Sequence, residues 1–364
     1  MEVGELDLVD FRNYESARVE FVTGLNLVEG RNGQGKTNLL EAVHTLSGLG
    51  SHRTSTLAPL VRHGAEFAVI RSRGKVKGRS VSVDAQIPRT GGIRLLVNKV
   101  AASRSPANDA LVSCVLFSPE DLALVKGGPE ERRRFMDQAA SRMRPLATTE
   151  RQEFERALKQ RNGVLKAASF SSRAAGQLDV WTEQLVKSGS VVVRNRLRVL
   201  EAIAAKVTGH YTEVSGTGEG PALVYESSWI RPEDDDIEAR LRAALEAAQP
   251  REIERGVSLV GPHRDDLLIS LGAADARTFS SQGEQRSLAL ALRLAERDLV
   301  SEARGESPVL LLDDVFSELD EQRRARLGEL VLSSGQTIAT ATSAADLPLE
   351  PQRSIKIEAG KVMR

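Results

Sequence analysis

The stretch that most constrains the fold of this chain is residues 30–37, which follow the pattern G-x-x-x-x-G-K-T. It consists of Gly30, Arg31, Asn32, Gly33, Gln34, Gly35, Lys36 and Thr37. The apolar residues 25–28 predict a short buried strand before it, and helical spacing over residues 38–49 predicts a helix after it. Glycines between a strand and a helix let backbone N–H groups curl around phosphates, and the helix N-terminus adds partial positive charge. We expect Lys36 to reach the β- and γ-phosphates of a nucleotide and Thr37 to hold Mg²⁺, because a glycine-rich turn without a ligand fits this context poorly.

Two adjacent carboxylates follow another apolar run. Residues 308–312 predict a buried parallel strand, and Asp313 and Asp314 stand at its end. Asp313 at such a strand end suits a direct or water-mediated contact with Mg²⁺. Asp314 beside it can polarise an attacking water. A strand followed by an acidic turn is the plain alternative, and the P-loop in the same chain favours the metal site.

A serine and a glycine precede the strong helix predicted over residues 287–303. Ser281 stands three residues before Glu284, which is the spacing of a capping box that satisfies the first N–H groups of a helix. Ser281, Gly283 and the helix N-terminus can equally form a second anion site. Both interpretations use the same geometry, so both remain open. Residues 317–320, S-E-L-D, indicate by themselves only a helix cap.

Arg12 lies in residues 11–14, a turn one strand before the P-loop. A cation at this place can lie beside the phosphates or the base of a nucleotide, which makes Arg12 a candidate nucleotide-binding residue. A surface turn explains the same residues equally well, and spacing alone does not choose between the two.

Basic residues are concentrated in residues 62–104, although the whole chain has 50 Lys and Arg against 50 Asp and Glu. Ten basic residues there stand against only Glu66 and Asp84. A solvated hairpin edge and a contact with the phosphate backbone of a nucleic acid account for this excess about equally well. Aromatic residues make up only 4% of the chain, which argues against binding by base stacking. The ten residues are Arg62, Arg71, Arg73, Lys75, Lys77, Arg79, Arg89, Arg94, Lys99 and Arg104.

Apolar periodicity divides the chain into an α/β part and a mostly helical part. Residues 66–100 alternate and predict antiparallel β structure, whereas little β signal occurs between about residues 130 and 222. We therefore expect an α/β head built from residues 1–120 and 221–364. A mostly α-helical arm, residues 121–220, is inserted into it.

Targeting and redox signals are few. Cys114 is the one cysteine, so no disulfide forms within the chain. The acidic start MEVGELDLVD is no signal peptide, and no stretch approaches the ~20 apolar residues that span a membrane. We expect a soluble, cytoplasmic protein without a membrane partner.

The order of these motifs resembles the ABC-type ATPase superfamily. Walker A lies at residues 30–37, an S-x-G-x-Q-like signature at 281–286, Walker B at 309–314 and a D-loop at 317–320. The resemblance implies an ABC-type P-loop head in which Ser281 and Gly283 of one subunit act on ATP held by the other.

A set of further stretches resembles one branch, the RecF family of bacterial recombination proteins. The resemblance implies binding of ATP and Mg²⁺, slow ATP hydrolysis, ATP-dependent homodimers, and binding of single-stranded and duplex DNA. With RecO and RecR, such proteins help to load RecA at gaps, and they serve replication and the SOS response. By motif, Lys36 binds the phosphates, and Thr37 and Asp313 serve Mg²⁺. The matching stretches are residues 11–14, 33–42, 51–54, 117–122, 261–265, 281–286 and 312–320.

The chain departs from the superfamily pattern at three places. Asp314 stands where most ABC ATPases carry a Glu, so we expect slow turnover. Residues 337–342 offer hydroxyl groups where a His is usual, and Ser118 and Glu120 stand where a Gln is usual. An ATPase head of the SMC or Rad50 type is the alternative, but it needs coiled coils far longer than this arm. A transporter subunit would carry its signature closer to the P-loop.

Overall fold

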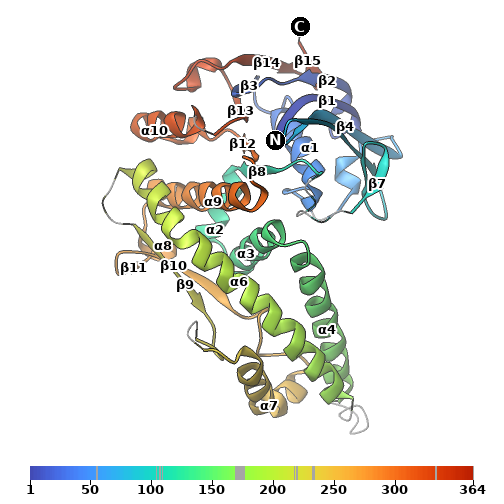
Figure 1. Cartoon of the computed structure of the whole chain (residues 1–364), viewed down its shortest axis with the longest axis vertical. Helices are drawn as coiled ribbons and strands as arrows, with labels where there is room; N and C mark the ends of the chain where they lie inside the picture. Colours follow the sequence, from blue (N-terminus) through green and yellow to red (C-terminus); the bar gives the residue numbers. More distant parts are fainter. Residues whose placement is uncertain are drawn as a thin grey trace. The chain divides into compact units, whose positions relative to one another are not determined.

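The computed structural model describes residues 1–54, 56–103, 105, 108, 110–168, 177–216, 218, 220–231, 234–332 and 334–363. The chain folds as two compact units (Figure 1). The first unit comprises Met1–Asp121, Gly209–Gly218 and Arg286–Arg364, and the second comprises Leu122–Thr208 and Glu219–Gln285. Among the described residues, no helix combines the length and the apolar character needed to cross a bilayer.

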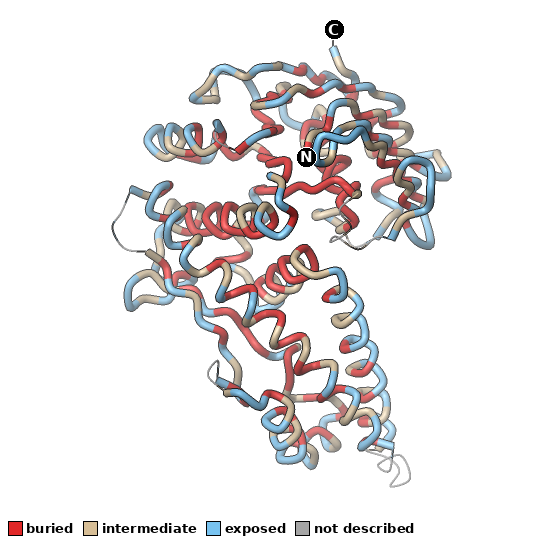
Figure 2. The backbone as a smooth tube through the Cα atoms, in the orientation of Figure 1, coloured by how far each residue is buried: buried red, intermediate tan, exposed pale blue. Residues whose placement is uncertain are grey.

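One sheet of the first unit is antiparallel throughout, in the order β2-β1-β4-β5-β6-β7. Buried and exposed stretches alternate along the chain in this sheet (Figure 2). In β4, for example, Ala68 and Ile70 are buried while Arg71 and Arg73 are exposed. This confirms the antiparallel β region expected from the sequence. The strands are β1 (Glu2–Phe11), β2 (Tyr14–Glu20), β4 (Phe67–Val76), β5 (Arg79–Pro88), β6 (Arg94–Val97) and β7 (Val100–Ala102).

The other sheet of the first unit has the order β15-β14-β3-β13-β12-β8. All neighbours pair in parallel except β14 with β15. Every residue of β8 and β12 is buried, which explains why their sequences are continuous apolar runs. The strands are β3 (Leu25–Glu29), β8 (Cys114–Phe117), β12 (Val309–Leu312), β13 (Thr337–Ala341), β14 (Arg353–Glu358) and β15 (Lys361–Val362).

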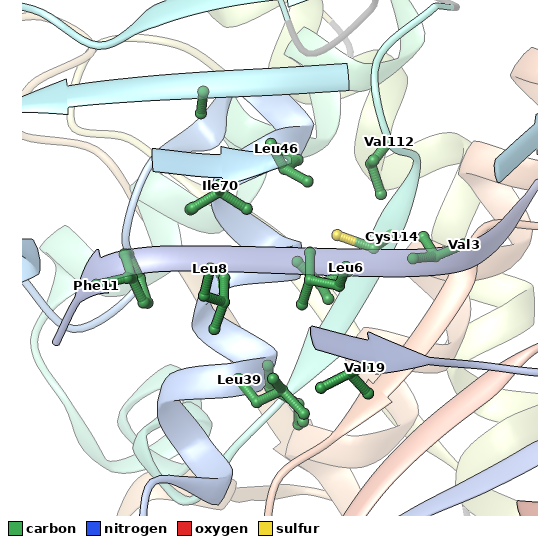
Figure 3. Close-up of a cluster of buried hydrophobic side chains, with 14 of the residues drawn as sticks. Val3, Leu6, Leu8, Phe11, Val19, Leu39, Leu46, Ile70, Val112 and Cys114 are labelled. Carbon is green, nitrogen blue, oxygen red and sulfur yellow. The ribbon is translucent and has the colours of Figure 1, made fainter. Parts of the chain in front are cut away.

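Helix α1 (Lys36–His44) joins the two sheets into one core. It contacts β1 of the antiparallel sheet and β8 and β13 of the parallel sheet. Leu39 on α1 and Leu46 just after it lie among Leu6, Ile70 and Cys114, as Figure 3 shows. The first unit also contains η1 (Thr45–Leu49), η2 (Ala58–Leu60), η3 (Pro119–Leu122), η4 (Phe316–Glu318), α10 (Glu321–Leu332) and η5 (Ala344–Asp346).

The side chain of Gln336 also links the two sheets. Its amide accepts from the backbone N–H of Val3 at 2.8 Å and donates to the carbonyl of Val3 at 2.8 Å and that of Val22 at 3.1 Å. Gln336 immediately precedes β13 and is buried. Its side-chain amide satisfies the backbone N–H and carbonyl of Val3 in β1, which would otherwise be buried without these partners.

The second unit packs helices against a three-stranded antiparallel sheet, β11-β10-β9. Helix α3 contacts β10, and α7 contacts α4. The helices are α2 (Ala123–Lys126), α3 (Pro129–Met143), α4 (Ala147–Ala168), α7 (Ile237–Arg255) and α8 (Ala276–Phe279). The strands are β9 (Pro221–Glu226), β10 (Asp266–Leu271) and β11 (Ala274–Asp275). Helices α6 (Leu178–Ser215) and α9 (Gln282–Arg304) each begin in the second unit and end in the first.

The second unit is larger than the arm expected at residues 121–220. Residues 219–285 belong to it, whereas the sequence analysis assigned residues 221–364 to the head. Residues 219–285 join this unit because β9 pairs with β10 and α7 packs on α4. Local sequence patterns do not predict such contacts between distant segments. The break predicted between the arm helices, residues 169–176, lies outside the described residues.

Candidate nucleotide site

The P-loop connects β3 to α1 in the first unit, as its sequence predicts. Gly35 is the N-cap of α1 with φ 117°, and a Cβ at this residue would lie 2.8–2.9 Å from side-chain atoms of Asn13 and Tyr14. Only glycine fits there, so the close packing behind the loop fixes the start of the helix. Arg31, Asn32 and Gly33 are exposed, so the front of the loop faces solvent.

Residues of the 11–14 turn support the loop from behind. Asn13 Nδ2 donates to the Gln34 carbonyl at 3.0 Å, and the Tyr14 hydroxyl donates to the Gly35 carbonyl at 3.0 Å. The Gln34 carbonyl also accepts from the Gly360 N–H at 3.1 Å. Sequence reasoning quoted this turn as a motif but gave these two side chains no role.

Lys36 places its ammonium group inside the loop. Nζ donates to the Gly30 carbonyl at 2.9 Å and to Asn32 Oδ1 at 3.3 Å, and it lies 3.8 Å from Asp314 Oδ1. The side chain is only 4% exposed, so this charge is held in one place. From there it can pair with a phosphate oxygen at the mouth of the loop.

Thr37, the residue after Lys36, contacts Asp313. Thr37 Oγ1 donates to Asp313 Oδ1 at 3.0 Å, and Thr340 Oγ1 donates to the same oxygen at 2.8 Å. Burial raises the pKa of Asp313 to about 6, and the charges of Asp314 and Glu120 act in the same direction. A hydroxyl and a carboxylate are the hard oxygen ligands that Mg²⁺ prefers, so these two residues fit the ion that the sequence predicts.

Asp314 has an unusual backbone conformation. Its φ is 49°, which is left-handed and costly for a residue other than glycine. The conformation is held by the Asp314 N–H, which donates to Thr340 Oγ1 at 2.8 Å, and by the Asp314 carbonyl, which accepts from Ser317 Oγ at 2.8 Å. In this conformation Asp314 Oδ1 lies 3.8 Å from Lys36 Nζ.

Arg12 lies against α1. Its Nε and Nη2 donate to the two carboxylate oxygens of Glu41 at 2.7 and 2.6 Å, and its Nη1 donates to the Pro59 carbonyl at 3.0 Å. Glu41 is fully buried and also accepts from Ser51 Oγ at 2.5 Å. These contacts hold the guanidinium beside the P-loop helix, with 16% of the Arg12 side chain exposed. Arg12 ties its own turn to the P-loop helix, and Glu41 is a residue that sequence reasoning missed.

Ser281 and Gly283 lie in the second unit, and the capping box predicted for them is present. Glu284 N donates to Ser281 Oγ at 3.3 Å, and Ser281 N donates to Glu284 Oε2 at 2.7 Å. Ser281 remains exposed at the start of α9. In the first unit, Arg286 Nη1 donates to the Glu318 carbonyl at 2.9 Å, which connects the signature segment to the D-loop.

Charges of opposite sign alternate across the antiparallel sheet that carries most of the basic segment. Arg18, Asp7, Arg71 and Asp84 are direct neighbours across β2, β1, β4 and β5. Opposite charges therefore stand side by side, which is a stabilising cross-strand arrangement. Of the ten basic residues, Arg62 pairs with Asp10, Arg73 with Glu5 and Lys99 with Asp84. Arg104 lies outside the described residues.

Comparisons with known proteins agree with this geometry. The family model described as "RecF/RecN/SMC N terminal domain" matches residues 2–353. A protein of Frankia alni named "DNA replication and repair protein RecF" is 43% identical over the full length of both chains. A protein of the same name from Leifsonia xyli subsp. xyli is 41% identical and covers 100% of this chain and 99% of its own.

Solved structures show the same fold. A structure described as the recombination mediator protein RecF-ATP in the RecFOR pathway has a TM-score of 0.91 at 30% identity and covers 99% of this chain and 96% of its own. The Smc head domain of Pyrococcus furiosus has a TM-score of 0.58 at 19% identity and covers 99% of this chain and 95% of its own. The ABC-type head expected from the motif order is therefore confirmed at the level of the fold.

Proposed function

The chain belongs to the RecF family within the SMC-like ABC ATPases, and on this premise we propose that it is an ATP-binding protein of DNA replication and repair. The observation that carries the proposal is that the P-loop meets the two carboxylates after β12: Thr37 contacts Asp313, and Lys36 lies 3.8 Å from Asp314. The P-loop N–H groups and Lys36 hold the phosphates, and Thr37 and Asp313 hold Mg²⁺. Mg²⁺ held by Thr37 and Asp313 would supply positive charge that polarises the phosphates and offsets the charge developing on them.

We further propose that the protein hydrolyses ATP slowly. Asp314 is the group that orients and polarises the attacking water, and it is one methylene shorter than the Glu of most ABC ATPases. Arg12, whose guanidinium Glu41 holds against α1, is proposed to lie beside the nucleotide bound at the P-loop. Slow turnover suits a timed switch rather than a motor.

The switch that we propose is ATP-dependent dimerisation. Ser281 is exposed at the start of α9, where a hydroxyl and a helix N-terminus suit an anion. Ser281 and Gly283 of one subunit would bind the ATP of the other, so the homodimer would be stable only while ATP is intact. A chromosome-organising role of the SMC type finds no support in the helix lengths, since α4 has 22 residues and α6 has 38.

DNA is the partner that we propose for the dimer, with single-stranded and duplex DNA both bound through their phosphate backbones. Exposed arginines and lysines of the β4–β7 segment support this, and the low aromatic content favours backbone contacts over base stacking. By family, we propose that the protein acts in the cytoplasm with RecO and RecR to load RecA at gaps, during replication and the SOS response.

Sedimentation of the wild type and Lys36→Met with ATP and Mg²⁺, with and without gapped duplex DNA, tests the proposal. We expect a dimer that requires ATP and Lys36 and that DNA strengthens. A monomer under all conditions, with DNA bound regardless of nucleotide, would remove the proposed role of Ser281 in the partner's site.

A further inference from the structure

Thr340 is a buried residue near the end of β13 that contacts both Walker B carboxylates. Its hydroxyl donates to Asp313 Oδ1 at 2.8 Å and accepts from the Asp314 N–H at 2.8 Å, and it lies 3.3 Å from Asp314 Oδ1. Thr340 is fully buried. Thr340 therefore lies between Asp313, the proposed Mg²⁺ ligand, and Asp314, the group proposed to polarise the attacking water.

The hydroxyl has one proton, and this fixes the direction of its bonds. The acceptor of that proton is Asp313, at the shorter distance, and the oxygen lone pairs remain for the Asp314 N–H. Donation to Asp313 supports its charged form, which burial opposes. Acceptance from Asp314 anchors the left-handed backbone at φ 49° that brings its carboxylate within 3.8 Å of Lys36 Nζ.

We propose that Thr340 is a positioning residue of the nucleotide site. It orients the Asp314 carboxylate toward the water that attacks the phosphate. The inference rests on the proposed ATPase function. Without the hydroxyl, the Asp314 N–H loses its partner and the strained backbone can relax. The carboxylate then leaves Lys36, while the P-loop and Thr37 stay in place, so nucleotide binding survives and the chemical step slows.

The same strand offers a matched control. Thr337 lies three positions earlier on β13 and is also fully buried, and its hydroxyl has no hydrogen-bond partner within the described part of the chain. Loss of the Thr337 hydroxyl therefore disturbs no contact of the site. A difference between these two threonines isolates the effect of the Asp313 and Asp314 contacts from any general effect of a hydroxyl in the sheet.

The test compares Thr340→Ser with Thr340→Ala, which both lose the methyl group and differ only in the hydroxyl. We expect Thr340→Ser to keep kcat within about threefold of the wild type and Thr340→Ala to lower it about tenfold further, as the loss of one buried hydrogen bond predicts. KM and the equilibrium affinity for ATP with Mg²⁺ stay unchanged. Thr337→Val behaves like the wild type in every assay.

Two further measurements separate positioning from a structural role. In an Asp314→Asn background, the difference between Ser and Ala at residue 340 should shrink to about twofold, because Thr340 acts through Asp314. Hydrogen exchange at the Asp314 amide should be slow in the wild type and Thr340→Ser and fast in Thr340→Ala. Both readouts remain usable if Thr340→Ala is less stable, since Thr340→Ser also lacks the methyl group and shows the effect of that loss alone.

The outcomes distinguish the two proposals. A wild type that neither binds nor hydrolyses ATP would overturn the proposed function, and the role of Thr340 with it. A wild type that hydrolyses ATP, with equal kcat for Thr340→Ser and Thr340→Ala, would overturn the inference alone. A raised KM with unchanged kcat in Thr340→Ala would also overturn it, because the residue would then support binding rather than the chemical step.

Discussion

The hydroxyl of Thr37 lies 3.0 Å from the carboxylate of Asp313, although 276 positions separate the two residues along the chain. Thr37 is in the first turn of α1, and Asp313 follows β12, two strands from β3 in the parallel sheet. The metal site that we propose therefore needs the N- and C-terminal segments of the first unit to have folded together. Its parts can be tested separately because each contributes a different bond.

Thr37→Ala should weaken ATP binding only when Mg²⁺ is present. In the proposed site the Thr37 hydroxyl, which contacts Asp313, serves the ion, whereas Lys36 and the P-loop backbone serve the phosphates. We expect a loss of about tenfold or more in affinity with Mg²⁺ and none with EDTA, measured by titration calorimetry. Thr37→Ser is the control and should bind like the wild type. An equal loss with EDTA would show that Thr37 supports the loop rather than the ion.

Asp314→Glu should hydrolyse ATP faster than the wild type. The longer side chain extends the carboxylate by about 1.5 Å, the length of one C–C bond, toward the attacking water. Asp314→Asn should hydrolyse more slowly, because an amide is a poor base. Single-turnover assays of both variants make the comparison. A Glu variant no faster than the wild type would count against the proposal that the short side chain limits turnover.

Glu41→Ala should unfold more easily than the wild type. Glu41 is fully buried and binds Arg12 through both oxygens, so its removal leaves a guanidinium that is 16% exposed without a counter-ion. We expect a loss of about 3–5 kcal/mol in the free energy of unfolding, measured by urea denaturation. Glu130 pairs with Arg134 on the surface and is 78% exposed, so Glu130→Ala should cost no more than about 1 kcal/mol. Equal losses in the two variants would contradict the buried role of Glu41.

His263 should make the second unit less stable in mild acid. Burial, with the nearby charges of Arg264 and Arg133, lowers the pKa of His263 to about 4 from 6.5. The unfolded chain binds more protons than the folded chain between these values, so the free energy of unfolding falls as the pH drops from 6.5 to 4. The full effect is about 3 kcal/mol.

Thermal melting across this pH range tests the effect. His263→Gln should lose much of the dependence, because its side chain does not titrate. His63 is exposed and lies in the first unit, so His63→Gln is the control and should follow the wild type. A His263→Gln variant with the wild-type pH profile would show that other groups cause the acid sensitivity.

Arg79 and Arg94 should contribute more to DNA binding than Arg73 and Lys99. All four are exposed, but the last two pair with Glu5 and Asp84, while Arg79 and Arg94 have no ion pair with any residue that the structure describes. A cation that already has an ion pair within the protein contributes less binding free energy when it contacts a DNA phosphate. We expect the double variant Arg79→Ala/Arg94→Ala to lower the salt slope of binding by roughly 1–2.

Fluorescence anisotropy with duplex and single-stranded DNA at several salt concentrations measures these slopes. Arg73→Ala/Lys99→Ala carries the same change in net charge and is the control. Equal slopes for the two double variants would mean that this surface is a solvated sheet edge and that DNA binds elsewhere on the protein.

Local sequence patterns predicted the parts of the head but not all of its contacts. The strand–loop–helix at residues 25–49 and the buried strand before Asp313 are present where the spacing places them. These signals are strong because a P-loop needs glycine at Gly35, where any side chain would meet Asn13 and Tyr14. The need for a residue without a side chain at Gly35 is therefore visible both in the sequence motif and in the packing of the fold.

Contacts between distant segments could not be read from the sequence. Glu41 looks like an ordinary helix residue, yet the fold brings Arg12 and Ser51 to its carboxylate. Thr340 stands in a stretch with several hydroxyls, and only the pairing of β13 with β12 selects it for the Walker B carboxylates. The basic excess of residues 62–104 was counted without β1, which supplies Glu5 as an acidic partner.

The position of β3 between β13 and β14 has a consequence for synthesis on the ribosome. The antiparallel sheet uses only strands within the first 102 residues, so it can form early. β3 must wait for strands made about 300 residues later, which takes roughly 15–60 s at 5–20 residues per second. During that time a nascent chain carries the whole P-loop without Asp313. On the proposed function, the pair of oxygen ligands for Mg²⁺ is complete only after Asp313 has been made and β12 has joined the sheet.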